Sequence, residues 1–280
     1  MPELPEVETV RSGLAPVMEG QTIRRANINR PNLRFAFPHG FCARLTGAEI
    51  MQVRRRAKYL LIDLSRGETL IAHLGMSGRF SIVPPGEDPP PDTKAAHDHV
   101  EWHLSNDHRI LYNDPRRFGF MDLCKSTALA ESKFLAGLGP EPLGNGFSSA
   151  WLTEQFSGKS RPVKSALLDQ HVVAGLGNIY VCEALFRAGI HPKTLVRSIG
   201  TKRRDRLLVC IREVIAEAIK AGGSTLRDYA AVDGALGYFQ HRFSVYGREG
   251  EPCAHAACPG TVRRIVQSGR SSFYCPRCQR

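Results

Sequence analysis

Four cysteines near the end of the chain impose a strict geometric condition on the fold. They form two close pairs separated by sixteen residues: Cys253 with Cys258, and Cys275 with Cys278. The residues between the pairs are typical of a short β-hairpin. Two such pairs at the turns of a hairpin suit one tetrahedral Zn²⁺. Four thiolates leave no position for water, so the spacing predicts a structural metal and not a catalytic one.

The positive charge of the chain is concentrated in its second half. Residues 1–150 contain 18 Lys and Arg against 17 Asp and Glu, a net of +1, whereas residues 151–280 contain 20 against 10, a net of +10. This asymmetry favours a polyanionic partner, most often nucleic acid, because binding releases counterions. A basic surface that serves only solubility explains the charge equally well. The acidic start and the lack of a long apolar run lead us to expect a soluble cytoplasmic protein without membrane insertion.

The spacing of apolar residues predicts two different domains. Residues 5–19 repeat valine and leucine at helical spacing, and residues 22–123 consist of short β-rich runs broken by Gly and Pro. Residues 1–138 are therefore expected to form a β-sandwich with a leading helix. Five prolines between residues 84 and 91 predict a loop.

A Gly- and Pro-rich segment at residues 139–149 is interpreted as a hinge linker. Residues 150–280 are then predicted to be helical and to end in a zinc finger at 246–280. Residues 201–219 place their apolar side chains on one helical face. Residues 166–188 indicate two helices interrupted by glycines, with Asn178 as the cap of the second. The predicted fold class is α+β.

The first residues carry a candidate nucleophile. If Met1 is removed, Pro2 presents a secondary amine beside Glu3 and Glu6. An α-amino group has a pKa of roughly 7.7 to 8.0, so a useful fraction is neutral near neutral pH. Its attack on an aldehyde-level carbon gives an iminium, which suits cleavage of a glycosidic bond followed by loss of phosphate. On this segment alone the simpler interpretation is favoured, in which these residues only start a helix.

Three further segments combine basic and apolar residues. Lys58 lies between a run of arginines and an apolar strand, so its amine either faces a groove or is solvated. Residues 73–78 and 114–119 are predicted tight turns. An apolar side chain beside a cation on such a turn suits insertion into the minor groove of DNA. Each of these residues, taken singly, fits a core position better.

In combination, these segments resemble the family of bacterial formamidopyrimidine-DNA glycosylases. The resemblance rests on the string from Met1 to Thr9, on Lys58, on the two turns, on residues 175–180 and on the four cysteines, which occur in the family's order along the whole chain. It implies a bifunctional base-excision repair enzyme. Such an enzyme removes 8-oxoguanine and formamidopyrimidines from duplex DNA and then acts as an AP lyase, cleaving the strand by β,δ-elimination through a Schiff base.

The resemblance also implies a catalytic role for each matching residue. Pro2 attacks the sugar C1′, Glu3 protonates the opening sugar ring, and Glu6 supports this arrangement. Lys58 is the implied proton donor for β-elimination, and Arg270 is the implied donor for δ-elimination. A guanidinium on a metal-stiffened hairpin can stabilise a leaving phosphate, which agrees with the second assignment.

Further implied features concern DNA and the metal. A void-filling triad replaces the everted nucleotide: Met76, Arg116 and Phe118. Additional DNA contacts are implied at other positions: His73, His97, Lys159, Lys164, Asn178 and Tyr246. Residues 222–237 resemble the loop that closes over the everted base. The second domain would be a helix-two-turns-helix unit with one structural Zn²⁺ and no organic cofactor, in a monomer that works at the bacterial nucleoid.

Two alternatives stay open at this point. An endonuclease VIII-like enzyme would use the same chemistry at Pro2 but prefer oxidised pyrimidines. Leu4 and the turn at Arg116 to Phe118 favour the purine-lesion branch. A non-catalytic zinc-hairpin protein that binds nucleic acid would explain the charge and the cysteines, and it would not need Pro2.

Overall fold

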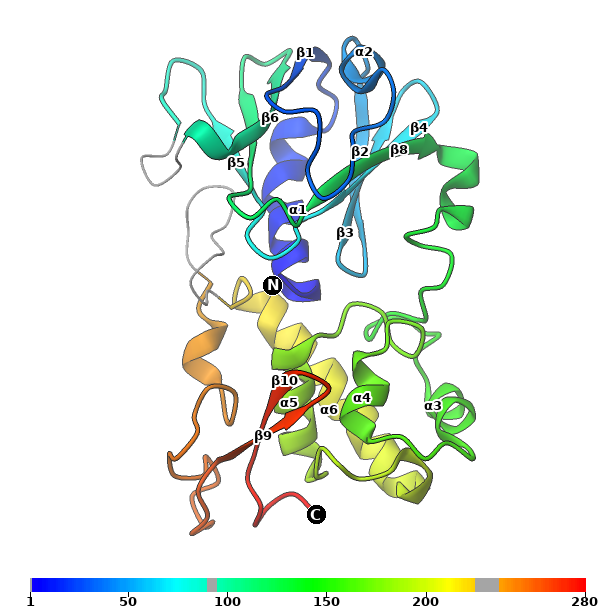
Figure 1. Cartoon of the computed structure of the whole chain (residues 1–280), viewed down its shortest axis with the longest axis vertical. Coiled ribbons are helices and arrows are strands. Elements are labelled where there is room, and N and C mark those ends of the chain that lie inside the picture. The colour runs from blue at the N-terminus through cyan, green and yellow to red at the C-terminus, as the bar shows by residue number, and fades with distance from the viewer. Residues whose placement is uncertain (1, 90–94, 225–236) are drawn as a thin grey trace. The chain divides into compact units, whose positions relative to one another are not determined.

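The computed structural model describes residues 2–89, 95–224 and 237–280. The chain divides into two compact units: Met1–Ala136 with Ala221–Tyr238, and Gly137–Lys220 with Phe239–Arg280. Figure 1 shows strands in the first unit and mainly helices in the second. No helix among the described residues is long and apolar enough to cross a membrane.

The described residues of the first unit contain two helices, two 3₁₀ turns and eight strands. They are α1 (Leu4–Met18), β1 (Ile23–Ile28), α2 (Phe41–Leu45), β2 (Ile50–Arg56), β3 (Tyr59–Leu64), β4 (Glu68–His73), β5 (Arg79–Val83), η1 (Ala95–His97), β6 (Asp98–Leu104), β7 (Arg109–Asn113), β8 (Phe120–Lys125) and η2 (Ser126–Glu131). The strands form two four-stranded sheets, ordered β1-β6-β7-β5 and β2-β3-β4-β8, and all neighbouring strands are antiparallel.

One apolar core joins the two sheets and α1. Leu60 from one sheet, Trp102 from the other and Leu14 from the helix all belong to it, and each is at most 1% exposed. The helix has the predicted position, with Pro5 in its first turn and its apolar face buried. The predicted β-sandwich with a leading helix is therefore confirmed.

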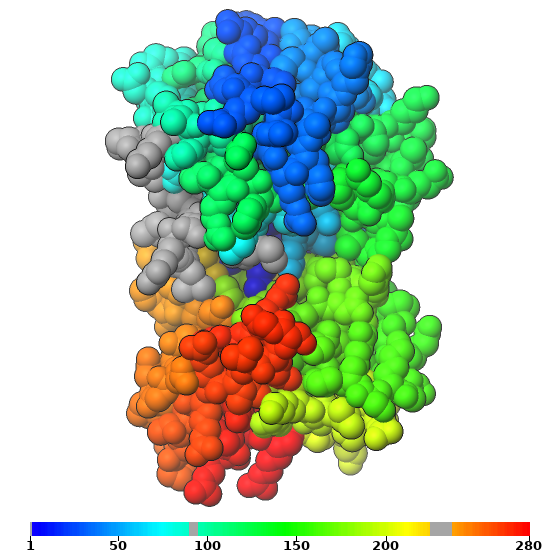
Figure 2. Space-filling model, in the orientation of Figure 1, coloured from blue at the N-terminus to red at the C-terminus, as the bar shows by residue number. Residues whose placement is uncertain are grey.

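The second unit contains four helices, two 3₁₀ turns and a two-stranded hairpin. They are α3 (Ser149–Phe156), α4 (Val163–Leu168), α5 (Asn178–Ala188), η3 (Val196–Ser198), α6 (Thr201–Lys220), η4 (Phe239–Arg242), β9 (Arg263–Gln267) and β10 (Arg270–Tyr274). The hairpin strands, coloured red in Figure 2, lie on the surface of this unit. The predicted helix at residues 201–219 and the terminal hairpin are confirmed. Of the two helices predicted within residues 166–188, the second corresponds to α5, whereas the first, α4, begins earlier and ends already at Leu168.

Some expectations need revision or cannot be assessed. Asn178 does not cap α5: Gly177 is the N-cap residue, and the Asn178 side chain donates instead to the Ser271 carbonyl at 3.0 Å. The predicted loop at 84–91 has no regular structure over residues 84–89, and its last two residues lie outside the described residues. Most of the predicted lid, residues 225–236, also lies outside them.

The predicted hinge at residues 139–149 is bonded to α6. The Arg212 guanidinium donates to the carbonyl oxygens of Pro142, Gly144 and Phe147 at 3.1, 3.3 and 2.7 Å. Phe147 itself is fully buried. These bonds attach the segment to the helical unit, and its role as a hinge remains a prediction.

A buried carboxylate holds the loop that leads into the zinc finger. Glu183 on α5 is fully buried and accepts backbone N–H bonds from Ser244, Val245 and Tyr246 at 2.9, 3.0 and 2.8 Å. The three amides lie in irregular backbone, where no strand or helix could satisfy them. The carboxylate therefore supplies the hydrogen-bond acceptors that a strand or helix would otherwise provide.

Replacing Glu183 with Ala should lower the free energy of unfolding by several kcal/mol. Each buried N–H that loses its acceptor costs about 1–3 kcal/mol. Urea unfolding measures the change. Glu213 on the same unit is exposed, so Glu213→Ala should change stability by less than about 0.5 kcal/mol. Similar losses for both variants would contradict the role assigned to Glu183.

Candidate functional site

The start of α1 is held in place by Glu6. Pro2 and Glu3 precede the helix, and both are buried. The Glu3 N–H donates to Glu6 Oε2 at 2.8 Å, one half of a capping box. The other carboxylate oxygen of Glu6 accepts from the backbone N–H and the hydroxyl of Ser224 at 2.8 and 2.9 Å. Glu6 thus ties the turn that carries Pro2 to a segment more than two hundred residues further along the chain.

Gly223 allows this close approach. Its φ is +77°, and a Cβ at this position would lie 3.1 Å from the Glu6 side chain. A residue with a side chain would be strained in its backbone and crowded against the carboxylate. Gly223, which falls within the predicted lid, therefore allows the contact between Ser224 and α1.

Lys58 occupies a tight turn between β2 and β3. The preceding Ala57 has a positive φ of 52°, and Lys58 is only 7% exposed. Arg55 fixes the turn, because its guanidinium donates to the Ala57 carbonyl at 3.1 Å and pairs with Glu8 of α1 at 2.8 Å. The ion pair links the turn that holds Lys58 to the helix that begins beside Pro2.

His73, at the end of β4, is a neutral imidazole. Burial, together with the positive charges of Lys58 and Arg34, lowers the pKa of His73 to about 4. The Gly75 N–H donates to His73 Nδ1 at 2.9 Å, so the ring proton lies on Nε2. That proton is a donor, and His73 can therefore offer a hydrogen bond without a charge.

Asp114 bonds two turns to each other. One turn carries Met76, and the other carries Arg116 and Phe118. Asp114 is fully buried and accepts from the Ser77 hydroxyl at 2.6 Å and from the Gly119 N–H at 2.8 Å. The Phe118 ring is 45% exposed, and the Arg116 guanidinium lies 4.8 Å from its centre. An exposed ring beside a cation is thus presented on a rigid base.

Two glycines let the backbones of these turns touch. A Cβ on Gly75 would lie 2.3 Å from Phe118 and Gly119 backbone atoms, and one on Gly119 would lie 2.7 Å from the His73 carbonyl oxygen. The turns border a cavity of about 630 Å³, which His73 and residues 32–34 also line. His97, the last residue of η1, lies in the same unit and is half-buried.

The second unit positions Arg270 at the start of β10. The next carbonyl, that of Ser271, accepts from Lys164 Nζ at 2.7 Å and from Asn178 Nδ2 at 3.0 Å. Lys164 also binds the Ser272 hydroxyl at 2.6 Å. Helices α4 and α5 therefore anchor the strand directly beside the exposed Arg270.

The other candidate DNA contacts of this unit differ in exposure. Lys159 is exposed and donates to Gln155 at 3.3 Å. The Tyr246 ring packs against Phe273 of β10 at 5.1 Å between centroids. Lys164, in contrast, is 1% exposed. Its described bonds support the hairpin, so a direct contact between Lys164 and DNA remains a prediction.

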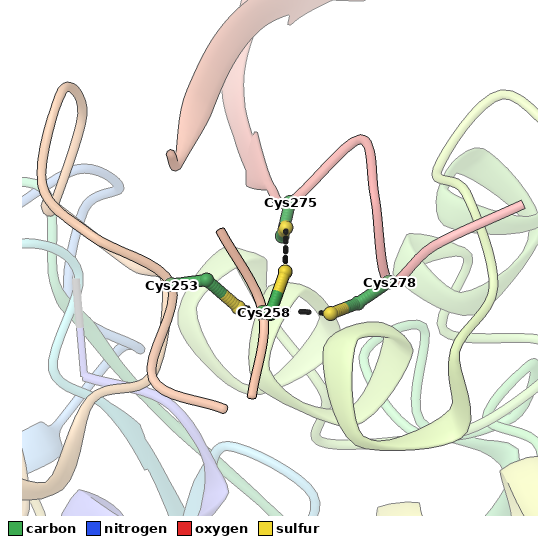
Figure 3. A group of neighbouring side chains, drawn as sticks. All are labelled: Cys253, Cys258, Cys275 and Cys278. Atoms are coloured by element: carbon green, nitrogen blue, oxygen red, sulfur yellow. Dashed lines mark hydrogen bonds between the residues drawn. The ribbon is translucent and has the colours of Figure 1, made fainter. Parts of the chain in front are cut away.

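Four thiols converge at the base of the hairpin (Figure 3). The sulfur atoms of Cys253, Cys258, Cys275 and Cys278 all lie within 4.8 Å of one another. The Cys253–Cys278 and Cys258–Cys275 sulfur distances are 3.6 and 3.7 Å. Tetrahedral Zn–S bonds of about 2.3 Å place sulfurs roughly 3.8 Å apart, so this set fits the ion.

Comparisons with known proteins agree along the chain. Three family models match: formamidopyrimidine-DNA glycosylase N-terminal domain at residues 1–121, formamidopyrimidine-DNA glycosylase H2TH domain at residues 138–230, and zinc finger found in FPG and IleRS at residues 250–280. A formamidopyrimidine-DNA glycosylase of Ruegeria pomeroyi is 59% identical, with both chains fully covered. The chain belongs to the formamidopyrimidine-DNA glycosylase family.

Solved structures of this family superpose closely on the chain. A mutant Lactococcus lactis Fpg in complex with Fapy-dG DNA is 34% identical, with a TM-score of 0.89 and full coverage of both chains. The Lactococcus lactis Fpg in complex with abasic-site DNA is also 34% identical, with a TM-score of 0.89 and 99% coverage of each chain. The predicted α+β fold and the single structural zinc held by four cysteines are confirmed.

Three residues that hold the site of this family member were missed from sequence: Ser77, Asp114 and Glu183. Asp114 stands directly before a Pro and a Gly-terminated turn, where a buried acidic residue has a structural use. Glu183 is the single acidic residue of α5, whose other residues are mostly apolar. A lone carboxylate in such a run is a usable sign of a buried acceptor.

Replacing Asp114 with Asn should weaken binding to duplex DNA that contains a tetrahydrofuran abasic analogue. An amide cannot accept at both positions, so one of the two turns loses its bond. We expect a loss of about tenfold, which corresponds to about 1.4 kcal/mol, close to one buried hydrogen bond. Fluorescence anisotropy measures the affinity. Asp107 is exposed at the opposite end of β7, and Asp107→Asn should bind as the unmodified protein does. Unchanged affinity for Asp114→Asn would contradict the role of Asp114 in holding the two turns together.

His73 should make the free energy of unfolding depend on pH. Its folded pKa is lowered from 6.5 to about 4, so between these values the unfolded chain binds the extra proton and stability falls as pH falls. The contribution is at most about 3 kcal/mol. Urea unfolding of His73→Gln at pH 7 and pH 4.5 should show a smaller difference than the unmodified protein. His39 is exposed, so His39→Gln should show the same difference in the free energy of unfolding between the two pH values as the unmodified protein.

Proposed function

We propose that this chain, a base-excision DNA glycosylase by family, removes oxidised purines and then cleaves the DNA strand by β,δ-elimination through a Schiff base on Pro2. The observation that carries the proposal is the locked and buried N-terminal turn. The Glu6 carboxylate accepts hydrogen bonds from the Glu3 N–H and from Ser224, and these bonds hold the turn that begins with Pro2. A helix start alone does not require a carboxylate bonded to so distant a segment. The interpretation in which these residues only start a helix is therefore no longer favoured.

The chemistry begins at the secondary amine of Pro2. Its nitrogen attacks C1′ of the damaged nucleotide, the C1′–N bond breaks, and the base leaves with the electron pair and takes up the proton that the attacking nitrogen loses. The nitrogen lone pair then opens the sugar ring to give the iminium, and Glu3 donates a proton to O4′. The positive nitrogen then acts as an electron sink for the eliminations.

Two eliminations and one hydrolysis complete the reaction. Loss of a C2′ proton expels the 3′ phosphate, and loss of a C4′ proton expels the 5′ phosphate. We assign Lys58 as proton donor in the first elimination and Arg270 in the second, where its guanidinium also stabilises the departing phosphate. Water finally hydrolyses the imine and restores Pro2. The zinc serves only to hold the hairpin that carries Arg270.

Binding of DNA in this proposal divides between the two units. Met76, Arg116 and Phe118 fill the space of the everted nucleotide, and their rigid base reduces the cost of extrusion, which is a few kcal/mol. The remaining proposed contacts are His73, His97, Lys159, Lys164, Asn178 and Tyr246. For Lys164 and Asn178 the support is indirect, since both bind the strand beside Arg270.

We further propose that the enzyme acts in the bacterial cytoplasm on the nucleoid. The named relatives are bacterial, and their solved complexes contain damaged DNA. Chromosomal DNA is the matching substrate in such a cell. A single chain supplies every residue named in the reaction, so a monomer is sufficient.

Borohydride should trap the protein covalently on duplex DNA that contains 8-oxoguanine opposite cytosine. Trypsin digestion and mass spectrometry should place the adduct on the peptide of residues 2–11, which starts with Pro2. Glu3→Gln should slow base release by roughly 10²-fold or more, the usual effect of losing a positioned acid. An adduct on a lysine peptide would refute Pro2 as the nucleophile.

The same assay separates the alternatives. An endonuclease VIII-like enzyme would be trapped faster on a duplex with an oxidised pyrimidine. A non-catalytic binder would show salt-sensitive affinity and no adduct. Glu154→Gln provides a control, because Glu154 on α3 is exposed and the change should leave both base release and the adduct at Pro2 as they are.

A further inference from the structure

The first cysteine loop is longer than the second and carries a histidine. Four residues separate Cys253 from Cys258, whereas two separate Cys275 from Cys278. The Cys258 N–H donates to the His255 carbonyl at 2.9 Å, which closes a turn over residues 255–258. His255 Nδ1 lies 3.3 Å from Cys278 Sγ. The longer loop therefore brings an imidazole from one cysteine pair onto a sulfur of the other.

The chemistry of the metal site decides which atom donates in this contact. A cysteine bound to Zn²⁺ is a thiolate and has no proton to give. The hydrogen between Nδ1 and Cys278 Sγ must then belong to the imidazole, so Nδ1–H donates to the sulfur. The ring is held for this purpose by Phe186 of α5, which is 2% exposed and lies 4.6 Å away between ring centroids at an interplanar angle of 32°.

This hydrogen bond stabilises the negative charge of the metal site. Four thiolates around Zn²⁺ carry a net charge of −2, and N–H donors to the sulfurs spread that charge. The Gly260 backbone supplies one donor to Cys258 at 3.4 Å. His255 supplies a side-chain donor to Cys278, a residue that lines a cavity of about 460 Å³ together with Phe186 and the basic residues Lys202, Arg203 and Arg206. Cys258 and Cys278 are both partly exposed, whereas Cys275 is fully buried.

We propose that His255 is an outer-sphere ligand of the zinc site, which donates Nδ1–H to the Cys278 thiolate and slows loss of the metal at this sulfur. Outer-sphere donors orient a ligand and tune the electron density that it gives to the metal. The cavity gives a chelator or a water molecule a route to Cys278 from solvent. His255 stabilises the Zn–S bond that lies on this route.

Three variants of the zinc-loaded full chain test the proposal. His255→Phe keeps a ring against Phe186 but removes the donor, whereas His255→Asn keeps an N–H near the position of Nδ1. His191→Phe is the matched control, because His191 packs on Tyr274 at 4.6 Å in the same unit and makes no described contact with sulfur. Release of zinc to a chromophoric chelator in excess EDTA measures the rate.

We expect His255→Phe to release zinc about tenfold faster, at the lower end of the usual effect of an outer-sphere partner. His255→Asn and His191→Phe should release it at nearly the original rate. Equal release from His255→Phe and the unmodified protein would overturn the proposal. Equal acceleration in His255→Phe and His255→Asn would overturn it as well, because the ring would then matter only through packing.

Cobalt substitution gives a readout that packing alone would not change. A donor to a thiolate lowers the energy of its lone pairs, so its loss should move the thiolate-to-Co²⁺ charge-transfer band to longer wavelength in His255→Phe. The band should stay in place in His255→Asn. An unshifted band in His255→Phe would count against the hydrogen bond. Borohydride trapping on the same preparations reports on the proposed glycosylase chemistry separately, so failure of one proposal is distinguishable from failure of the other.

Discussion

The carboxylate of Asp114 accepts hydrogen bonds from two turns whose bonded residues lie far apart in the chain. Ser77 belongs to the turn after β4, and Gly119 closes the turn before β8. Because the carboxylate is fully buried, water cannot replace either bond, and separating the turns would leave a buried charge without its donors. Met76 and Phe118 can therefore project from irregular backbone and still have fixed positions.

Two other buried carboxylates also hold irregular backbone in place through hydrogen bonds. Glu6 joins α1 to Ser224, and Glu183 joins α5 to the loop at residues 244–246. In each case a helix, whose own backbone is satisfied, offers an acidic side chain to amides that have no ladder partner. Backbone near a catalytic or binding residue can thus depart from regular structure without the penalty of an unpaired amide.

Sequence reasoning succeeded where the signal is local. The apolar spacing of α1 and α6, the β-rich runs of the sandwich and the cysteine pairs each lie within a short stretch. It failed where the partner is distant: Lys164 binds residues more than one hundred positions away, and the partner of Asn178 is on the hairpin. The sequence left open whether Lys58 faces a groove or solvent, and its position in a turn depends on the positive φ of Ala57. No local pattern encodes these pairings.

The hairpin is attached at its base by the four cysteines and near its tip by Lys164 and Asn178. Both of these side chains bind the carbonyl oxygen of Ser271. A main-chain oxygen is present whatever amino acid occupies the position, so the identity of residue 271 is nearly irrelevant to this attachment. Evolution can therefore exchange that side chain to suit different surroundings while the neighbouring arginine keeps its place.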